Sequence, residues 1–343
     1  MFGNDAKNSL ETTTIFLIDD RQSIRTKNHY STMPSIKESN ESLLGSSSYS
    51  TEAISSKINR KNIWNLIGFL LNMGFVYAVG TASIFPGAST NSDLSKKYQT
   101  IITPSGRAFS IWALIYVSQT IFTIAQLLPK FRGHIMVQKG VSYWYLATCF
   151  AQVGWSFAFA YEAIPLSLAF MLVILFSLYG LLYSQYYTKS DGSLQEFWLL
   201  RFPFYIHAGW ITAATALNVN VVAVWRSALA PTQLAMGIVS LAVLHAVSVW
   251  VLFNLKKSPN YTIACVLSWA NGWIYSELQS PNDLVVGTFS EDIISGVANA
   301  AISVSFIILF QVIIRVFMSI IEARSSGRRE NVEESNMNDD SML

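Results

Sequence analysis

The chain has 343 residues, of which 52% are hydrophobic and only 13% are charged, and its mean hydropathy is +0.36. The hydrophobic residues form long blocks, a pattern typical of a membrane protein and not of a soluble one. A formal net charge of +2 without a basic aromatic platform gives no support to nucleic-acid binding. Cys149 and Cys265 both lie within apolar blocks, so they indicate neither a disulfide framework nor a Cys-based metal site.

Eight apolar blocks reach the roughly twenty residues that a membrane-spanning helix requires. They cover residues 62–85, 107–128, 141–161, 164–187, 199–225, 232–253, 260–277 and 293–321. Asn271 and Glu277 interrupt the seventh block, and the eighth is long enough to tilt. We therefore predict an all-α, polytopic helix bundle.

Both ends of the chain are polar. Residues 1–60 are rich in Ser, Thr and Asn with mixed charge and hold no segment able to bury a core, and the stretch 322–343 is similar. We predict that both are disordered cytosolic tails. Acidic residues in the N-terminal stretch argue against a mitochondrial transit peptide, and no signal peptide is visible. We expect a multi-pass protein of an intracellular organelle membrane.

The distribution of Lys and Arg predicts the orientation, because cations are enriched in cytosolic loops. With the N-terminus in the cytosol, thirteen cations lie on the cytosolic side and four on the opposite side. The thirteen are Lys57, Arg60, Lys61, Lys130, Arg132, Lys139, Lys189, Arg201, Lys256, Lys257, Arg324, Arg328 and Arg329, and the four are Lys96, Lys97, Arg107 and Arg226. This count predicts that both termini are cytosolic.

The fifth block has a polar and aromatic face. At helical spacing its residues Trp210, Ala214, Leu217, Asn218 and Val221 fall on one side. An amide in hydrocarbon is costly without a hydrogen-bond partner, so Asn218 must face another helix, a water-lined cavity or a ligand.

The second and third blocks carry similar faces. In the second, Phe109, Trp112, Ala113 and Tyr116 share one side. In the third, the shared side is formed by Gln152, Trp155, Ser156 and Phe159. Aromatic walls with a few polar anchors are typical of a site for a rigid hydrophobic ligand.

These faces resemble the tryptophan-rich sensory protein (TspO) family, which includes the mitochondrial translocator protein that binds sterols and porphyrins. The string from Trp210 to Asn218, WITAATALN, looks like the family's fifth-helix signature. The spacing of Pro104, Trp112 and Tyr116 is similar to its second-helix pattern, and Gln152, Trp155 and Ser156 resemble its third-helix pattern. The chain departs from the family at Phe109, at Gln152 in place of an asparagine, and at Pro203.

The resemblance implies a five-helix core, residues 61–226, whose centre is capped by the loop 86–103 and receives a tetrapyrrole or sterol-like ligand; porphyrin or haem would then be bound as ligand. Three further transmembrane helices, residues 227–321, place the chain in a longer branch, and a homodimer is expected at family level. The predicted ligand-binding residues are Phe109, Trp112, Tyr116, Gln152, Trp155, Trp210, Ala214 and Asn218, with Arg107 and Arg226 at the rim.

Plainer interpretations stay open. Trp112 and Trp155 fit interfacial or helix-packing tryptophans, and Asn218 fits an interhelical hydrogen bond. Thr212 and Thr215 are expected to bond carbonyls of their own helix. Lone histidines on different spans, such as His207, fit packing or a proton-sensitive contact better than a metal site or axial haem ligation. The rim arginines fit snorkelling to headgroups as well as an anionic ligand group.

Three functions are compatible with these features. The first is binding of a hydrophobic small molecule in a sensing or shuttling role. The second is a small-solute transporter or channel, with Gln152, His207, Asn218 and His245 along its path. The third is a scaffold whose tails recruit partners. No nucleophile elbow, phosphate loop or pair of intramembrane carboxylates points to an enzyme.

Overall fold

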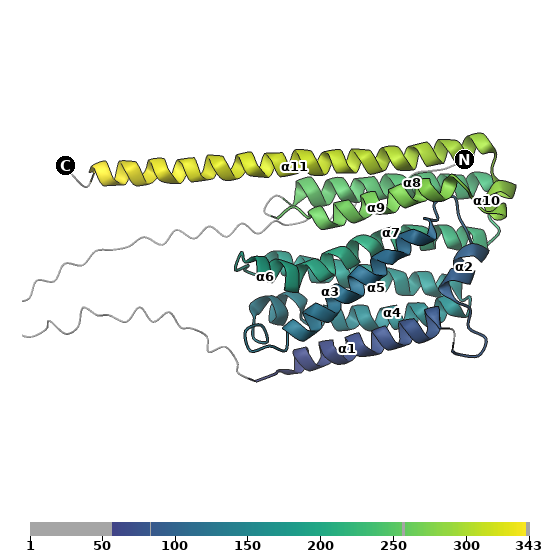
Figure 1. Ribbon diagram of the computed structural model, residues 1–343, viewed down its shortest axis with the longest axis horizontal. Helices are drawn as coiled ribbons and strands as arrows, with labels where there is room; N and C mark the ends of the chain where they lie inside the picture. Colours follow the sequence, from purple (N-terminus) through teal and green to yellow (C-terminus); the bar gives the residue numbers. More distant parts are fainter. Residues whose placement is uncertain (1–56, 83, 256–257, 341–343) are drawn as a thin grey trace, which may run out of the picture. The chain divides into compact units, whose positions relative to one another are not determined.

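The computed structural model describes residues 57–82, 84–255 and 258–340, and the regular elements in these ranges are helices (Figure 1). The long helices are α1 (Arg60–Val76), α3 (Ile111–Ala125), α4 (Trp144–Ala160), α5 (Ile164–Tyr187), α7 (Phe202–Trp225), α8 (Ala230–Val249), α9 (Tyr261–Leu278) and α11 (Glu291–Asp340). Short helices are α2 (Asn91–Lys97), α6 (Leu194–Glu196) and α10 (Asp283–Thr288). A 3₁₀ segment, Gly106–Ser110, precedes α3, and π-helical segments flank several of the long helices.

A long helix lies at each of the eight predicted spans, and the all-α membrane fold is confirmed. Among the described residues, six helices are long and apolar enough to cross a bilayer by length and composition. The other two are α4, with 17 residues, and α9, with 18. At 1.5 Å per residue α4 is about 26 Å long, against a hydrocarbon core of about 30 Å. That α4 and α9 also span the membrane stays a prediction.

Helix α7 lies at the centre of the bundle. It packs against α3, α5, α8 and α9, and 15 of its 24 residues are buried. Small residues permit this close packing. At Gly209, a Cβ atom would lie 2.9 Å from the Cβ atom of Val266 on α9, so a glycine is needed where the two helices meet. The helices that follow Trp225 therefore pack directly on the predicted five-helix core.

Sequence reasoning missed the short helices, although a capping residue marks the start of each of the three. Thr90 caps α2, its Oγ1 accepting a hydrogen bond from the backbone N–H of Asp93 at 3.1 Å. Asn282 caps α10 in the same way. A Thr or Asn that satisfies the free N–H groups of a first turn is a helix-start signal. The signal was overlooked because these helices are too short to form an apolar block.

The loop between the first two spans, residues 86–103, contains α2 and is called the capping loop below. Its residues Ile101 and Ile102 are 1% and 2% exposed and belong to a hydrophobic cluster with residues of α8, α9, α10 and α11. The three later long helices thus hold the loop that joins the first two spans. In Figure 1, α2 and α10 lie at the same end of the bundle.

Helix α11 continues past Ile321, into the segment whose polar composition predicted a disordered tail, and ends at Asp340. Extending an existing helix costs less free energy than nucleating a new one. The predicted N-terminal tail lies outside the described residues up to residue 56.

Candidate functional site

A cavity of about 580 Å³ lies between α3, α4, α5 and α7, with the capping loop over one end. The structure brings all eight predicted ligand-binding residues together in its lining: Phe109, Trp112, Tyr116, Gln152, Trp155, Trp210, Ala214 and Asn218. These side chains come from α4, from α7, and from α3 with the 3₁₀ segment that precedes it. Their placement is observed, and their role in binding stays a prediction.

The predicted face of α7 is the face that lines the cavity. Trp210, Ala214, Leu217, Asn218 and Val221 all contribute to the lining. By contrast, Ala113 and Ser156, which share the predicted faces of α3 and α4, lie outside it. Ser156 donates to the carbonyl oxygen of Gln152 at 3.0 Å and is fully buried.

The cavity wall is aromatic, and its rings are arranged in pairs. Trp112 and Tyr116 stack with ring centroids 5.6 Å apart, at an interplanar angle of 25°. Phe109 meets Trp210 edge to face at 5.5 Å. Across the cavity Trp155 stacks on Phe159 at 5.1 Å and 12°. Offset-stacked and edge-to-face pairs are the favoured arrangements of aromatic rings, so packing fixes the positions of the walls.

Hydrogen bonds tie these rings to polar side chains of neighbouring helices. Trp155 donates from Nε1 to Oδ1 of Asn218 at 3.0 Å, and Asn218 donates from Nδ2 to Oγ of Ser167 at 3.3 Å. Gln152 donates from Nε2 to the hydroxyl of Tyr116 at 3.0 Å. Asn218 therefore links α4, α5 and α7, as the plainer interpretation expects, while also lining the cavity.

Four polar atoms on cavity-lining residues are buried and have no hydrogen-bond partner among the described residues. They are Trp210 Nε1, Gln152 Oε1, Asn91 Oδ1 and Gln99 Oε1. An unsatisfied buried donor or acceptor costs about 1–3 kcal/mol. Each of these groups calls for an explanation, because buried polar atoms in folded proteins normally have a hydrogen-bond partner.

Sequence reasoning missed two groups of side chains that line the cavity. The resemblance implied that the loop 86–103 caps the cavity, but it did not identify the polar side chains that this loop contributes, which include those of Asn91, Lys96 and Gln99. The second is Glu277, near the end of α9 and outside the predicted five-helix core. From the sequence, Glu277 is only a polar interruption of the seventh predicted span. Neither its spacing nor its neighbours in the sequence indicate a partner almost two hundred residues away.

The two rim arginines lie at the surface and do not line the cavity. Arg226 lies over the ring of Trp225, with the guanidinium carbon 5.1 Å from the ring centroid. Arg107 is exposed at the start of the segment before α3. Their predicted contact with an anionic ligand group stays untested.

Three other polar residues of α7 serve the helix bundle. Thr212 and Thr215 donate to the carbonyl oxygens of Ala208 and Ile211 at 2.8 and 2.7 Å, which confirms the expected bonds within the helix. His207 is buried, and its Nδ1 lies 2.9 Å from Nε2 of Gln119. His207 is outside the cavity lining, so the geometry favours the packing interpretation over haem ligation.

An ion pair fastens the end of α2. Glu162 lies in the turn between α4 and α5, and its Oε2 is 2.5 Å from Lys97 Nζ and also accepts from the Tyr98 hydroxyl. The bond from Lys97 lowers the pKa of Glu162, and the same bond raises the pKa of Lys97. The backbone of Glu162 has φ +57°, in the left-handed region that residues other than glycine rarely adopt.

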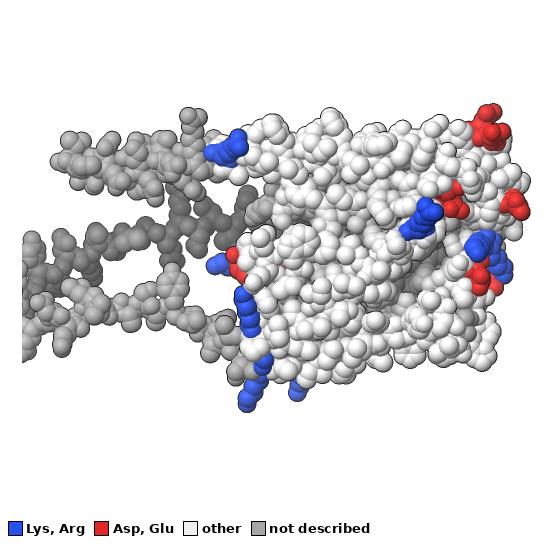
Figure 2. All heavy atoms as spheres, viewed as in Figure 1, with Lys and Arg blue, Asp and Glu red and all other residues white. Residues whose placement is uncertain are grey.

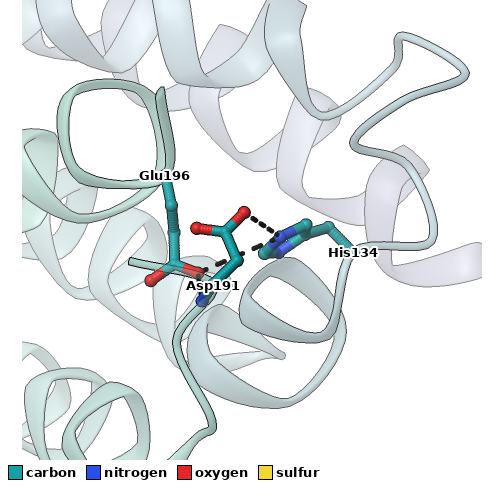
Figure 3. Close-up of side chains that lie close together, drawn as sticks. All are labelled: His134, Asp191 and Glu196. Carbon is teal, nitrogen blue, oxygen red and sulfur yellow. Dashed lines mark hydrogen bonds and ion pairs between the residues drawn. The ribbon is translucent and has the colours of Figure 1, made fainter. Parts of the chain in front are cut away.

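A cluster of titratable side chains lies at the opposite end of the bundle (Figure 3). Nε2 of His134 is 3.4 Å from Oδ2 of Asp191 and 3.9 Å from Oε2 of Glu196. Metal binding through Nε2 needs a free lone pair there. However, Nδ1 accepts a hydrogen bond from the backbone N–H of Met136 at 3.2 Å, which places the proton of the neutral ring on Nε2.

Glu196 in this cluster is already neutralised, because Arg201 donates from Nε to its Oε1 at 2.7 Å. A hydrogen bond from the backbone of Ser193 holds the pKa of Asp191 at about 2. These hydrogen bonds and ion pairs link the α3–α4 connection to the α5–α7 connection, and they favour a structural role for the cluster over metal binding.

Comparison with known proteins gives one match. A family model described as TSPO-like protein matches residues 62–316, which include all of α1 but its first two residues, the other helices that line the cavity and most of the apolar part of α11. No curated protein and no solved structure matches the chain. The matched region extends well beyond the five-helix core, residues 61–226, and reaches into the last of the three later spans.

Proposed function

The chain belongs to the TSPO-like protein family, and we propose that its cavity binds a flat, hydrophobic small molecule of the tetrapyrrole or sterol-like class, in a sensing or shuttling role. The observation that carries this proposal is the meeting of three aromatic faces around one cavity. A volume of about 580 Å³ falls within the range of about 300–1,000 Å³ that is usual for small-molecule sites.

The chemistry of the lining suits such a ligand. The stacked pairs Trp112–Tyr116 and Trp155–Phe159 offer ring faces to a planar body, and Ala214 leaves room between them. Because the rings are held by packing and hydrogen bonds, little conformational entropy is lost when a ligand binds. Trp210 lines the cavity and its buried N–H has no partner among the described residues, which supports the proposal that it donates to a polar atom of the ligand.

Tryptophan fluorescence tests this proposal. Purified protein would be titrated separately with protoporphyrin and with a conjugated fluorescent sterol, each of which accepts excitation energy from nearby tryptophans. We expect saturable quenching by at least one of them. In the double variant Trp112→Phe with Trp155→Phe, Trp210 is the tryptophan of the cavity lining that remains. We expect the amplitude of quenching to fall and the apparent Kd to rise about tenfold, since two walls lose contact area.

The matched control is Trp64→Phe with Trp198→Phe, which removes two tryptophans that are 45% and 54% exposed and lie outside the cavity. This variant should keep the saturable quenching. The proposal fails if quenching by both ligands is unsaturable, or if the cavity variant and the control behave alike.

A further inference from the structure

One end of the cavity carries a carboxylate that comes from outside the five-helix core. Glu277 on α9 and Gln99 on the capping loop both line this end. Gln99 donates from Nε2 to Oε1 of Glu277 at 2.6 Å. The two residues are 178 positions apart in the sequence, so only the packing of α9 against the capping loop brings them together.

This hydrogen bond fixes which way the amide of Gln99 points. An ionised carboxylate only accepts hydrogen bonds, so the NH₂ group of Gln99 must face Glu277. Its carbonyl oxygen, Oε1, is then an acceptor with no partner among the described residues, although the residue is only 5% exposed. The residues that line this end therefore include an amide whose buried oxygen has no partner and a half-buried carboxylate, and both groups can accept further hydrogen bonds.

The charges around this end favour the same kind of partner. Lys96 is the cation in the cavity lining, and its side chain is exposed, so water and salt screen its charge. Glu277 is less exposed than Lys96, so solvent and salt screen its charge less. A ligand carboxylate placed here would meet two acceptors and a negative charge.

We infer that Glu277 and Gln99 select ligands whose polar end donates hydrogen bonds, a hydroxyl or an ammonium group, over ligands that end in a carboxylate. This inference rests on the proposed function, because it concerns the same cavity. It gives α9 a part in ligand choice: the helix supplies the acidic residue that the five-helix core lacks at this end.

The test uses three steroids that share one ring system and carry a hydroxyl, a primary amine or a carboxylate at the same ring carbon. Binding to the full-length protein in detergent would be measured by calorimetry at pH 7.5. We expect the alcohol and the amine to bind at least about tenfold more tightly than the acid, as like-charge placement and unpaired polar groups oppose the acid.

Variants separate charge from hydrogen bonding. In Glu277→Gln, which keeps an acceptor for Gln99, the acid should come within about threefold of the alcohol and the amine should weaken about tenfold. A steroid with a ketone at the same ring carbon cannot donate a hydrogen bond, so the unmodified protein should bind it less tightly than the alcohol. In Gln99→Met, which keeps the length but removes the amide oxygen, this difference in affinity should disappear. Glu291→Gln alters an exposed carboxylate on α11 outside the cavity and should change none of these affinities.

Equal affinities for the three steroids in the unmodified protein would overturn the inference and leave the proposed function standing. Equal effects of Glu277→Gln on all three would also overturn it, since they indicate only a structural role for the carboxylate. If none of the three, nor either fluorescent ligand, binds saturably, the proposed function falls and this inference falls with it.

Discussion

At the scale of single residues, buried polar side chains set the positions of the cavity walls. Asn218 is 4% exposed and satisfies its amide with Trp155 on one side and Ser167 on the other. In hydrocarbon such bonds have few competitors, so one amide can align three helices. Glu162 has a similar positioning role at the end of the bundle near α2, where it forms an ion pair with Lys97 and accepts a hydrogen bond from Tyr98 of the capping loop.

The ion pair of Glu162 and Lys97 predicts how docking of the capping loop depends on pH. The pKa of Glu162 is lowered from 4.5, so its contribution is complete above pH 4.5 and is lost as the pH falls through the lowered value. The pKa of Lys97 is raised from 10.5, so its contribution is complete below pH 10.5 and is lost as the pH rises through the raised value. We expect the loop to stay docked between these limits.

A spin label at Ser92→Cys, an exposed position on α2, would report this docking. The label should be immobilised at pH 7 and become mobile only below pH 4.5 or above pH 10.5. In Glu162→Gln it should be mobile at pH 7 as well, because the charge is gone. A label whose motion is the same in both proteins at pH 7 would contradict the prediction.

At the scale of elements, the later helices hold the capping loop over the cavity. Asn282, before α10, donates from Nδ2 to the carbonyl oxygen of Lys96 at 3.2 Å. Just after the loop, the backbone N–H of Ser105 donates to the carbonyl oxygen of Trp273 on α9 at 3.0 Å. Apolar packing of Ile101 and Ile102 against α8, α9 and α11 adds to these bonds. The cavity is thus closed by helices that follow the five-helix core in the sequence.

A substitution at Gly237 on α8 tests how far packing against this helix stabilises the docked capping loop. A Cβ atom there would lie 2.7 Å from Cγ2 of Ile101 and 3.3 Å from Cγ2 of Ile102, so Gly237→Ala must displace the capping loop. We expect the variant to lose about 1–3 kcal/mol of stability through overpacking. Trypsin should cut faster after Lys96 and Lys97, because a displaced loop is a better substrate.

The matched control is Gly272→Ala on α9, where the nearest atom to the new Cβ is Ser305 Oγ at an ordinary 3.7 Å. Both variants gain helix propensity, about 0.5–1 kcal/mol, so the difference between them reports the clash alone. Mass spectrometry of the tryptic fragments gives the cleavage rates. Equal rates in the two variants would mean that the loop does not depend on α8.

At the scale of the whole molecule, charge is distributed unevenly between the two ends of the bundle. Figure 2 shows Lys and Arg at both ends, with most of the visible Asp and Glu at the end of α2 and α10. The end where α1 begins carries most of the described cations that the sequence assigned to the cytosol: Lys57, Arg60, Lys61, Lys130, Arg132, Lys139, Lys189, Arg201 and Arg324. By the positive-inside rule we expect this end in the cytosol and the capping loop opposite it.

Cysteine labelling tests the orientation. In a Cys265→Ser background, with Cys149 retained because it is buried, single cysteines would replace Lys189 and Ser92 at opposite ends. In sealed vesicles with the cytosolic face outward, a membrane-impermeant maleimide should label Lys189→Cys at once and Ser92→Cys only after permeabilisation. The reverse pattern would invert the predicted topology.

Sequence alone determined the membrane class, the positions of the long helices and the cavity-facing side of α7. These properties are local: the length of an apolar block indicates a span, and a period of 3.6 residues identifies which side chains share a face. The predicted span 164–187 and helix α5 have the same limits, for the same reason.

Only the tertiary structure decided what closes the cavity and what polar groups meet at its capped end. Glu277 and Gln99, like Ile101 and Gly237, are neighbours through contacts between distant segments, which no local pattern encodes. The hydrophobic blocks specify that helices form, whereas steric fit between glycines and branched side chains and the need to satisfy buried amides specify which helices meet.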